Sequence, residues 1–464
     1  MMESEWEGLI SKLREEYEQA YAQSGAAHAR ASEVLVDGIS HGARTFVPYP
    51  FRIKAAEGAH VQDVDGHQIC DFWQGHYANI LGHNPPLVRR RLVDALDGGF
   101  GLQTGLLEER QVAFGSLLCN AVGGERIRFT TSGTLATMYA IMMARAYTGR
   151  DLIVKVGGGW HGASPFTLKG VHPVEGDFHR VDSAGVPEAT DKEIIVARFN
   201  DVENLCEIFE TFGDRIACFI LEPCPSGIGF IPATGDFMNT ARELTWEYGA
   251  LLILDEVITG FRFCAGGMQR LYGIKADLST FGKVVGGGMP LSAVVGRGDV
   301  MDLISEKAKE RVWFNGGTFS AHPLALLAGQ TMVEYLTEHE GEIYPALAAK
   351  GEKLRRGIEK VFADRGVLAQ CTGHGNGVVP GSSVGGVYFP LEEDHPPFSG
   401  DEFMDSHHCS VRLREEGLRL GLLLHQVNVV HGLGAVSYRH SEEDLERTLE
   451  AYDAFALRMA RERS

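Results

Sequence analysis

The sequence has few of the features that mark secreted or metal-binding proteins. Its 464 residues include only eight cysteines, and no two of them form a Cys-x-x-Cys pair. This scatter argues against a disulfide framework and is typical of reduced thiols in a cytosolic enzyme. The nearest approach to a ligand cluster is His407-His408-Cys409. Adjacent side chains point in different directions and no second pair has zinc spacing, so the sequence predicts no metal site.

Positive charge and long apolar runs are also scarce. The net charge is −19 and the pI is near 5.4, which argues against nucleic acid or an anionic membrane as the main partner. No run of 18 apolar residues occurs, and the acidic N-terminus (Met1 to Trp6) lacks the basic and apolar segments of a secretion signal. We therefore expect a cytoplasmic protein that acts on small molecules.

Short aliphatic runs alternate with helical segments through the middle of the chain. Examples are Leu152–Val156, Ala217–Leu221 and Leu251–Leu254. This strand-helix rhythm predicts an α/β fold with a mainly parallel sheet. The length allows one large and one smaller domain. We predict a large domain at residues 76–334 and a small domain made of residues 335–464.

The N-terminal segment, residues 1–75, is expected to complete the small domain. Apolar residues recur there at three- and four-residue spacing and predict an amphipathic helix: Trp6, Leu9, Ile10, Leu13 and Tyr17. Two alternatives remain, because the apolar face can pack on a partner or on the protein's own core. Alternating residues from Arg52 to Asp71, around an Asp65-Gly66 turn signal, predict an antiparallel hairpin or meander.

The clearest chemical signal is the segment Asp277–Gly288, which places Lys283 in a nearly uncharged setting before a run of glycines. Low polarity disfavours the ammonium form, and a neutral amine can attack an aldehyde to form a Schiff base. The aldehyde most often held on a protein lysine is pyridoxal 5'-phosphate, which also needs a phosphate site, an acid at the ring nitrogen and a stacking aromatic. The alternative is a surface lysine in a loop.

Asp255 is the candidate acid. It directly follows the aliphatic run Leu251–Leu254, and ligands bind at the carboxyl ends of parallel strands. A carboxylate there can keep the ring nitrogen protonated, so that the ring withdraws electrons from the substrate's Cα. The alternative role is that of a helix cap.

Candidates for the phosphate site and the stacking ring also lie upstream. Ser132-Gly133-Thr134 opens a helical pattern, where free backbone N–H groups and the helix dipole favour an anion. Trp160 follows three glycines, which let the backbone bend so that an aromatic ring can lie flat on the cofactor. The alternatives are a plain helix cap and a packed core tryptophan.

Together these stretches resemble the class III aminotransferases, which are fold type I pyridoxal-phosphate enzymes, and most closely their glutamate-1-semialdehyde 2,1-aminomutase branch. The similarity runs from about Gly38 to the C-terminus. It rests on the ordered segments DVDG, LGHNPP, TTSGTLATMYAIMMARAYTGRD, GGGWHGAS, LEP with LLILDEVITGFR, TFGKVVGGGMPLSAVVG and GGTFSAHPLAL. The resemblance implies a large domain with a central, mainly parallel sheet, a smaller α+β domain, and a homodimer with active sites at the interface.

The resemblance also implies roles for individual residues. Lys283 would be the Schiff-base lysine, Asp255 the partner of the ring nitrogen, and Trp160 the stacking aromatic. The other expected cofactor contacts are Ser132, Gly133, Thr134, His161, Glu222, Val257, Gly317 and Thr318, of which Thr318 would reach the phosphate of the neighbouring subunit. For the substrate, Arg44 is similar to the arginine that takes a carboxylate, with His76 and Tyr77 nearby. The alternative for Arg44 is a surface arginine.

Four substrate-side positions differ from the aminomutase pattern. Its Ser-Trp pair reads Gly75-His76, its asparagine beyond the Glu-Pro dipeptide is Gly227, and its C-terminal glutamate aligns with Gly432. The cofactor positions are kept, so we predict pyridoxal chemistry on a different amino compound: an aminotransferase that uses an amine and an oxo acid or aldehyde. The alternatives are the aminomutase, which makes 5-aminolevulinate by intramolecular transfer, a racemase or decarboxylase, and a cofactor-binding protein without turnover.

Overall fold

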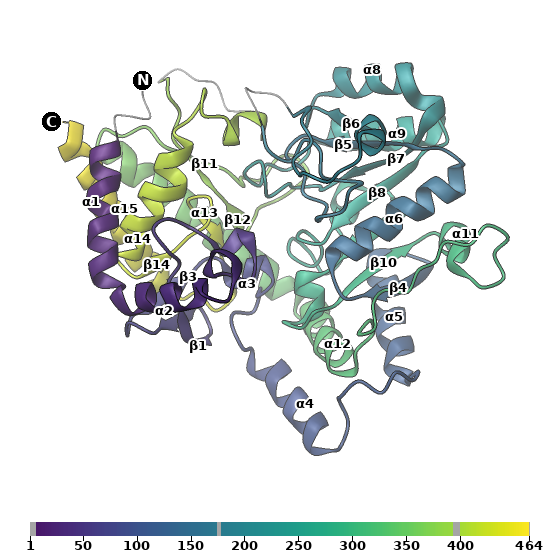
Figure 1. Cartoon of the computed structure of the whole chain (residues 1–464), viewed down its shortest axis with the longest axis horizontal. Helices are drawn as coiled ribbons and strands as arrows, with labels where there is room; N and C mark the ends of the chain where they lie inside the picture. The colour runs from purple at the N-terminus through teal and green to yellow at the C-terminus, as the bar shows by residue number, and fades with distance from the viewer. Residues whose placement is uncertain (1–5, 174–177, 393–399, 464) are drawn as a thin grey trace.

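The centre of the molecule is a seven-stranded sheet (Figure 1). The computed structural model describes residues 6–173, 178–392 and 400–463. The strand order is β4-β10-β9-β8-β7-β5-β6. The strands are β4 (Arg126–Thr130), β5 (Leu152–Val156), β6 (Ile194–Ala197), β7 (Ile216–Leu221), β8 (Leu251–Glu256), β9 (Leu278–Phe281) and β10 (Ser292–Gly296). Only β10 runs antiparallel to its neighbours, which confirms the predicted mainly parallel sheet.

Helices cover both faces of this sheet, which explains why its strands read as nearly continuous aliphatic runs. In β7, Phe219 and Leu221 pack towards α8 (Val202–Phe212) and α9 (Gly235–Glu247). The alternate residues Cys218 and Ile220 pack towards α6 (Gly133–Thr148). This alternation follows from the two-residue period of a strand. Figure 1 shows α8 and α9 together at one end of the sheet.

The β4 end of the sheet carries three further helices: α4 (Pro86–Asp97), α5 (Glu109–Val122) and α12 (Pro323–Glu338). A proline at the first position of α4 and of α12 suits the helix start, because its fixed φ is helical and its missing N–H group would have no partner there. The core that they share with β10 includes Phe114, Ala293 and Leu326.

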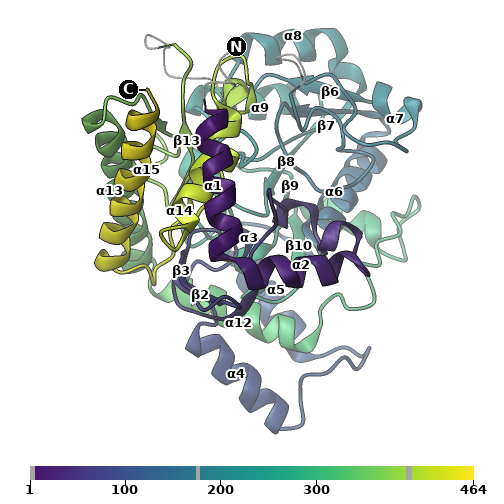
Figure 2. The same cartoon turned by 60° about the vertical axis from the view of Figure 1, so that its left-hand side comes forward.

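A second, four-stranded sheet joins the two ends of the chain. The meander predicted from residues 52–71 is present as β1 (Ile53–Glu57), β2 (His60–Asp63) and β3 (Gln68–Asp71). The short strand β14 (Val427–Asn428) adds parallel to β3. Figure 2 shows α1 (Glu7–Ala20), α13 (Glu340–Asp364) and α15 (Glu442–Arg463) beside this sheet.

The apolar face of α1 packs on the protein's own core. Leu13 and Tyr17 are fully buried in a cluster that also contains residues of α15 and β14. The predicted domain boundaries at 75/76 and 334/335 fall inside α3 (Gln74–Tyr77) and α12, and they remain predictions.

The remaining helices and strands are short. They are α2 (Ala22–Ser32), α7 (Glu188–Lys192), α10 (Gln269–Tyr272), α11 (Gly298–Met301), α14 (Arg419–Leu423), β11 (Gln370–Cys371), β12 (Val384–Gly385), β13 (Val387–Tyr388) and β15 (Gly434–Ala435). All eight cysteines are free thiols. Within the described ranges, no helix combines the length and the apolar character that a membrane span requires.

Candidate active site

Three ionisable residues meet at one edge of the large sheet. Glu222 directly follows β7, Asp255 is the next-to-last residue of β8, and Lys283 lies two residues beyond β9. These strands are adjacent and parallel, so their carboxyl ends share an edge, where ligands bind in open α/β sheets. The charges of Glu222 and Asp255 both act on the pKa of Lys283, so the structure brings the three together.

Lys283 is held in an unusual backbone conformation and a water-poor setting. Its φ of 47° is left-handed, which costs a non-glycine residue on the order of 1 kcal/mol and is typical of functional sites. Burial lowers the pKa of its amine, against the opposing charges of Glu222 and Asp255, and the Arg262 guanidinium lowers it further. The lowered pKa increases the fraction of neutral, nucleophilic amine.

Asp255 is fixed by three hydrogen bonds. Its Oδ1 accepts from the Thr280 hydroxyl at 3.1 Å and from the Val257 N–H at 3.1 Å, and its Oδ2 lies 2.8 Å from Nδ1 of His161. The side chain is only 3 % exposed. A buried carboxylate with this many partners has a defined orientation and can present its charge to a ring nitrogen.

His161 is the ring that completes this arrangement. Its backbone carbonyl accepts a 2.6 Å hydrogen bond from the Thr137 hydroxyl, which fixes the loop to α6. Burial lowers the pKa of the imidazole, although Asp255 opposes the shift. A neutral ring that donates through Nδ1 leaves Nε2 as an acceptor, and this Nε2 is buried without a hydrogen-bond partner among the described residues. Such a group fits beside a ligand.

Glu222 connects the site to Trp160. Its Oε1 accepts the backbone N–H of Trp160 at 2.8 Å. Burial raises the pKa of Glu222 well above its usual range, and the charge of Asp255 raises it further. The raised pKa reflects the cost of placing a second negative charge beside Asp255 in a buried site. The Trp160 side chain is 41 % exposed, so it is not a packed core tryptophan.

The start of α6 has the features of a helix N-terminus that can bind an anion. Ser132 caps the helix by accepting the N–H of Leu135 at 3.3 Å, and the next two residues, Gly133 and Thr134, present N–H groups that have no intrahelical partner. A Cβ on Gly162, whose φ is 87°, would meet the Thr134 hydroxyl at 2.4 Å. Only glycine therefore allows the loop after Trp160 to approach this helix start.

These features fit pyridoxal 5'-phosphate. The structure supplies an amine of lowered pKa, an oriented buried acid and a helix N-terminus at one edge of the sheet. Val257 also lies close to the start of α6, because a Cβ on Gly133 would be 3.0 Å from its side chain.

The substrate-side candidates converge on the same place. Burial and, to a smaller extent, the charges of Lys283, His41 and Arg44 together lower the pKa of His76 to about 3. Arg44 is itself exposed, on a short 3-10 turn at Gly42–Arg44. The structure therefore brings Arg44 and His76 towards the Lys283 amine.

Tyr77 lies behind His76. Its ring packs edge-on against Phe230, with centroids 5.0 Å apart, and its carbonyl accepts a 2.6 Å hydrogen bond from Arg262. The four residues from Gln74 to Tyr77 all have left-handed φ, at 47°, 61°, 62° and 67°. Consecutive left-handed residues are rare because each one other than glycine is strained. We call these four residues the left-handed turn.

Gly317 and Thr318 lie on the loop before α12, at the other side of α6. A Cβ on Gly317 would be 3.2 Å from the Thr131 hydroxyl, next to the start of α6. Thr318 is exposed and faces a cleft of about 500 Å³. The cleft is lined by Gln103, Thr104, Gly105, Leu106, Leu107, Gln111, Val112, Ile127, Arg128, Phe129, Thr318, Ser320, Ala321 and Pro323.

Several residues of this site were not among the sequence candidates. His41 packs edge-on against His76, with ring centroids 5.6 Å apart. His431 acts on the pKa of His76, and its Nδ1 lies 3.0 Å from Oε1 of Glu415. Burial acts to raise the pKa of Glu415, but His431 and Arg414 outweigh it and hold it well below the usual range. Residues so far apart in sequence carry no local motif that could have indicated the contact.

Comparisons with known proteins agree with this geometry. The family model of class III aminotransferases matches residues 41–379. The glutamate-1-semialdehyde 2,1-aminomutase of Thermoplasma acidophilum is 35% identical, over 91% of this chain and 96% of its own. An omega-transaminase from Sphaerobacter thermophilus is 30% identical, with a TM-score of 0.84 over 94% of this chain and 98% of its own. A transaminase solved with pyridoxal phosphate bound is 28% identical, with a TM-score of 0.81 over 96% and 99%.

The chain therefore belongs to the class III aminotransferases, and it is a pyridoxal 5'-phosphate enzyme of fold type I.

Proposed function

We propose that this protein is an aminotransferase that exchanges an amino group between a carboxylate-bearing amine and an oxo acid or aldehyde, with Lys283 as the catalytic residue. The observation that carries the proposal is the buried group at the ends of β7, β8 and β9, where an amine of lowered pKa lies with an acid fixed by three hydrogen bonds. Pyridoxal chemistry needs both the amine and the acid, whereas a buried lysine with another role does not need the acid.

The bound cofactor supplies an aldehyde and an electron-withdrawing ring. With the cofactor bound, Lys283 would hold its aldehyde group and would serve as the base for the proton on the substrate's Cα. Asp255 would keep a proton at the ring nitrogen, and His161 fixes the orientation of Asp255. Trp160 would stack on the ring. Ser132, Gly133 and Thr134 would bind the phosphate through the start of α6, with Gly317 beside them.

Positive charge on the substrate side supports a substrate that carries a carboxylate. Arg44 is permanently charged. Its charge and that of Lys283 both lower the pKa of His76. An acid group held by Arg44 would place the substrate's amino end towards Lys283. Neutral His76 supplies a hydrogen bond that adds no charge.

Two glycines support transamination rather than the aminomutase reaction. A Cβ on Gly227 would lie 2.4 Å from the carbonyl oxygen of Gly158, so an asparagine cannot be accommodated there without moving the loop. A Cβ on Gly432, whose φ is 83°, would meet Val387 at 2.7 Å. The polar side chains of the aminomutase pattern are therefore missing at these two positions.

The second candidate is the glutamate-1-semialdehyde 2,1-aminomutase reaction. It is favoured by the similarity to the aminomutase of Thermoplasma acidophilum, which extends over 96% of that protein. The two reactions share Lys283 and differ in whether the oxo intermediate leaves the site.

A substrate assay distinguishes the two reactions. The purified protein, loaded with pyridoxal 5'-phosphate, is incubated with a panel of amino acids and pyruvate or 2-oxoglutarate, and separately with glutamate-1-semialdehyde. Transamination predicts a keto product that accumulates in step with loss of the amino donor. Formation of 5-aminolevulinate without donor consumption would instead establish the aminomutase. If neither product forms while the cofactor is bound, the proposed activity is wrong.

We further propose that the protein is a homodimer whose partner completes the phosphate site through Thr318. Apolar side chains gather around the cleft that Thr318 faces, and their exposed fractions are unusually high: 73 % for Leu102, 77 % for Leu106, 91 % for Leu107 and 65 % for Val112. Exposed apolar groups of this density mark interfaces. A second copy of the chain suits this surface because Thr318 faces outwards from its own chain.

Replacing Leu107 by glutamate is expected to shift the protein from dimer to monomer in sedimentation velocity, because a charge would be buried in the interface. The loss of Thr318 from the site should also weaken phosphate binding and raise the concentration of cofactor needed for activity. Trp246→Gln is the matched control, since Trp246 is 81 % exposed on α9. A monomeric native protein, or a Leu107→Glu protein that remains dimeric, would contradict the proposed interface.

A further inference from the structure

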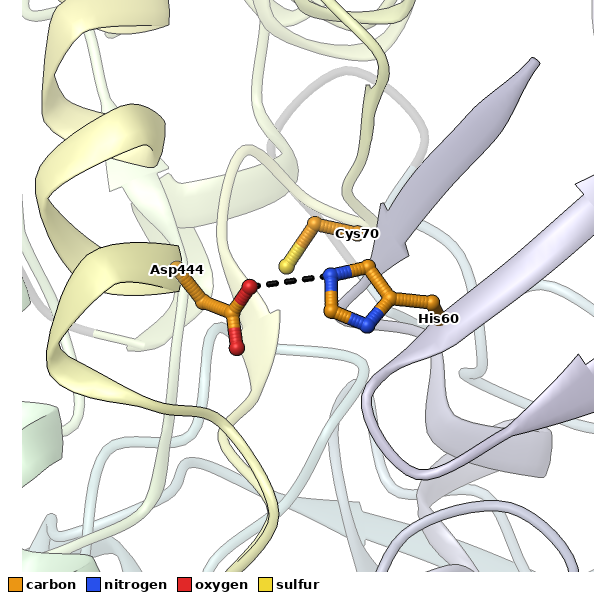
Figure 3. Close-up of side chains that lie close together, drawn as sticks. All are labelled: His60, Cys70 and Asp444. Atoms are coloured by element: carbon orange, nitrogen blue, oxygen red, sulfur yellow. Dashed lines mark ion pairs between the residues drawn. The ribbon is translucent and has the colours of Figure 1, made fainter.

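A group of potential metal ligands lies where the two ends of the chain meet. His60 is on β2, Cys70 is on β3 and Asp444 is in the first turn of α15. Figure 3 shows the three side chains pointing towards one another. Nε2 of His60 lies 2.9 Å from Oδ1 of Asp444, and the ligand atoms of all three lie within 4.8 Å of one another.

The backbone fixes this convergence. His60 and Cys70 are opposite one another in the antiparallel register of β2 and β3, so their side chains are on the same face of the sheet. Asp444 is held by the N-cap of α15. Its Oδ2 accepts from the N–H and the hydroxyl of Ser441, each at 2.8 Å, which leaves Oδ1 facing His60. Such outer hydrogen bonds orient carboxylate ligands in metal sites.

The set of donor atoms is one that zinc accepts. An imidazole nitrogen, a thiolate and a carboxylate bind Zn²⁺ at about 2.0 to 2.3 Å, so that ligand atoms in a tetrahedral site lie roughly 3 to 4 Å apart. The present spacing needs only a small contraction. His60 is 39 % exposed at its side chain, which gives an ion a route of entry and leaves room for water as a fourth ligand.

The surrounding charge also favours a cation. Burial raises the pKa of the Cys70 thiol and the charges of Asp444 and Asp71 raise it further, against Arg447; the same two carboxylates attract a cation, and a bound cation stabilises the thiolate. Thr448 is the polar neighbour of the thiol. An ion pair between His60 and Asp444 accounts for two of the three residues; Cys70 packs in the buried cluster with Ile69 and Phe72, and its sulfur points towards that pair.

We propose that His60, Cys70 and Asp444 form a structural zinc site that ties the N-terminal sheet to the C-terminal helix. On binding, the Cys70 thiol loses its proton to solvent and its sulfur bonds to the ion. The sequence predicted no metal site because residues 60, 70 and 444 have no zinc-motif spacing. The site lies outside the pyridoxal chemistry and does not depend on which reaction the enzyme catalyses.

The test uses the full-length holoenzyme, freed of metal by a chelator and titrated with Co²⁺. Tetrahedral coordination should give visible d–d bands at longer wavelengths than the cofactor absorbs, with one equivalent per chain. Zn²⁺ should displace Co²⁺ and raise the Tm, because an ion that binds only the folded state stabilises it. The Cys70→Ala variant should lose the bands and bind Zn²⁺ at least ~10-fold more weakly.

The matched control is Cys206→Ala, a partly exposed cysteine on α8, which should keep the bands. His60→Gln provides a second variant that should also lose them if Cys70→Ala does not fold. Bands that are absent from the native protein, or that persist in both site variants, would overturn the proposal. Asp444 is not substituted, because its loss would also remove the helix cap.

Discussion

Replacement of Lys283 by alanine should lower turnover by roughly 10⁴-fold or more, because this amine is both the attachment point of the cofactor and the base at the substrate's Cα. The variant should still bind pyridoxal 5'-phosphate, since the helix start at Ser132 and the acid Asp255 remain. After borohydride reduction, mass spectrometry should find the cofactor covalently attached to the native protein and absent from the variant.

Lys350→Ala is a suitable control for this experiment. Lys350 is also a partly buried lysine whose pKa burial lowers, but its amine donates to the carbonyl of Tyr438 in another part of the molecule. Its loss should leave labelling unchanged. If the reduced cofactor were found on Lys283→Ala, another lysine would have to be the attachment point and the assignment of the site would be wrong.

Replacement of Asp255 by asparagine should lower turnover by about 10² to 10⁴-fold, the size expected when a positioned acid-base partner is removed. The amide cannot keep a proton at the ring nitrogen by its charge. In one orientation the amide places its N–H₂ donor at the Oδ2 position, which now lies 2.8 Å from His161. In the flipped orientation the N–H₂ group replaces Oδ1, the acceptor for the Thr280 hydroxyl. Single-turnover measurements of Cα proton loss should show the defect directly.

The adjacent carboxylate provides the control. Glu256 follows Asp255 on β8, so its side chain points to the opposite face of the sheet. There it accepts hydrogen bonds from Thr259 and from the N–H of Gln269, and burial raises its pKa to about 7. Glu256→Gln should therefore keep most of the activity. Equal losses in both variants would indicate that folding, rather than the chemistry at Asp255, was disturbed.

Much of the cofactor side was predictable because its residues lie at the ends of regular elements. Asp255 follows an aliphatic run, which predicts its place at the carboxyl edge of the sheet, and Ser132 begins a helical pattern, which predicts an anion site at a helix start. The structure adds the partner of Asp255. His161 was expected only to contact the cofactor, yet it lies 2.8 Å from the acid.

The substrate side was less predictable because its residues come from separate segments. His41, His76 and His431 meet only after the N-terminal segment and the small domain have folded against the large sheet. No periodicity indicates such contacts. The left-handed turn was also missed, since Gln74 and Tyr77 have no special preference for that conformation and tertiary packing imposes it.

The left-handed turn narrows the ways in which evolution can alter the substrate range of this enzyme. At His76, with a φ of 62°, glycine and asparagine enter without much strain, whereas valine, isoleucine and threonine are strongly disfavoured. His431, with a φ of 53°, is restricted in the same way. New specificities should therefore arise first at His41 and Arg44, where neither restriction applies, and His76 and His431 should diverge more slowly.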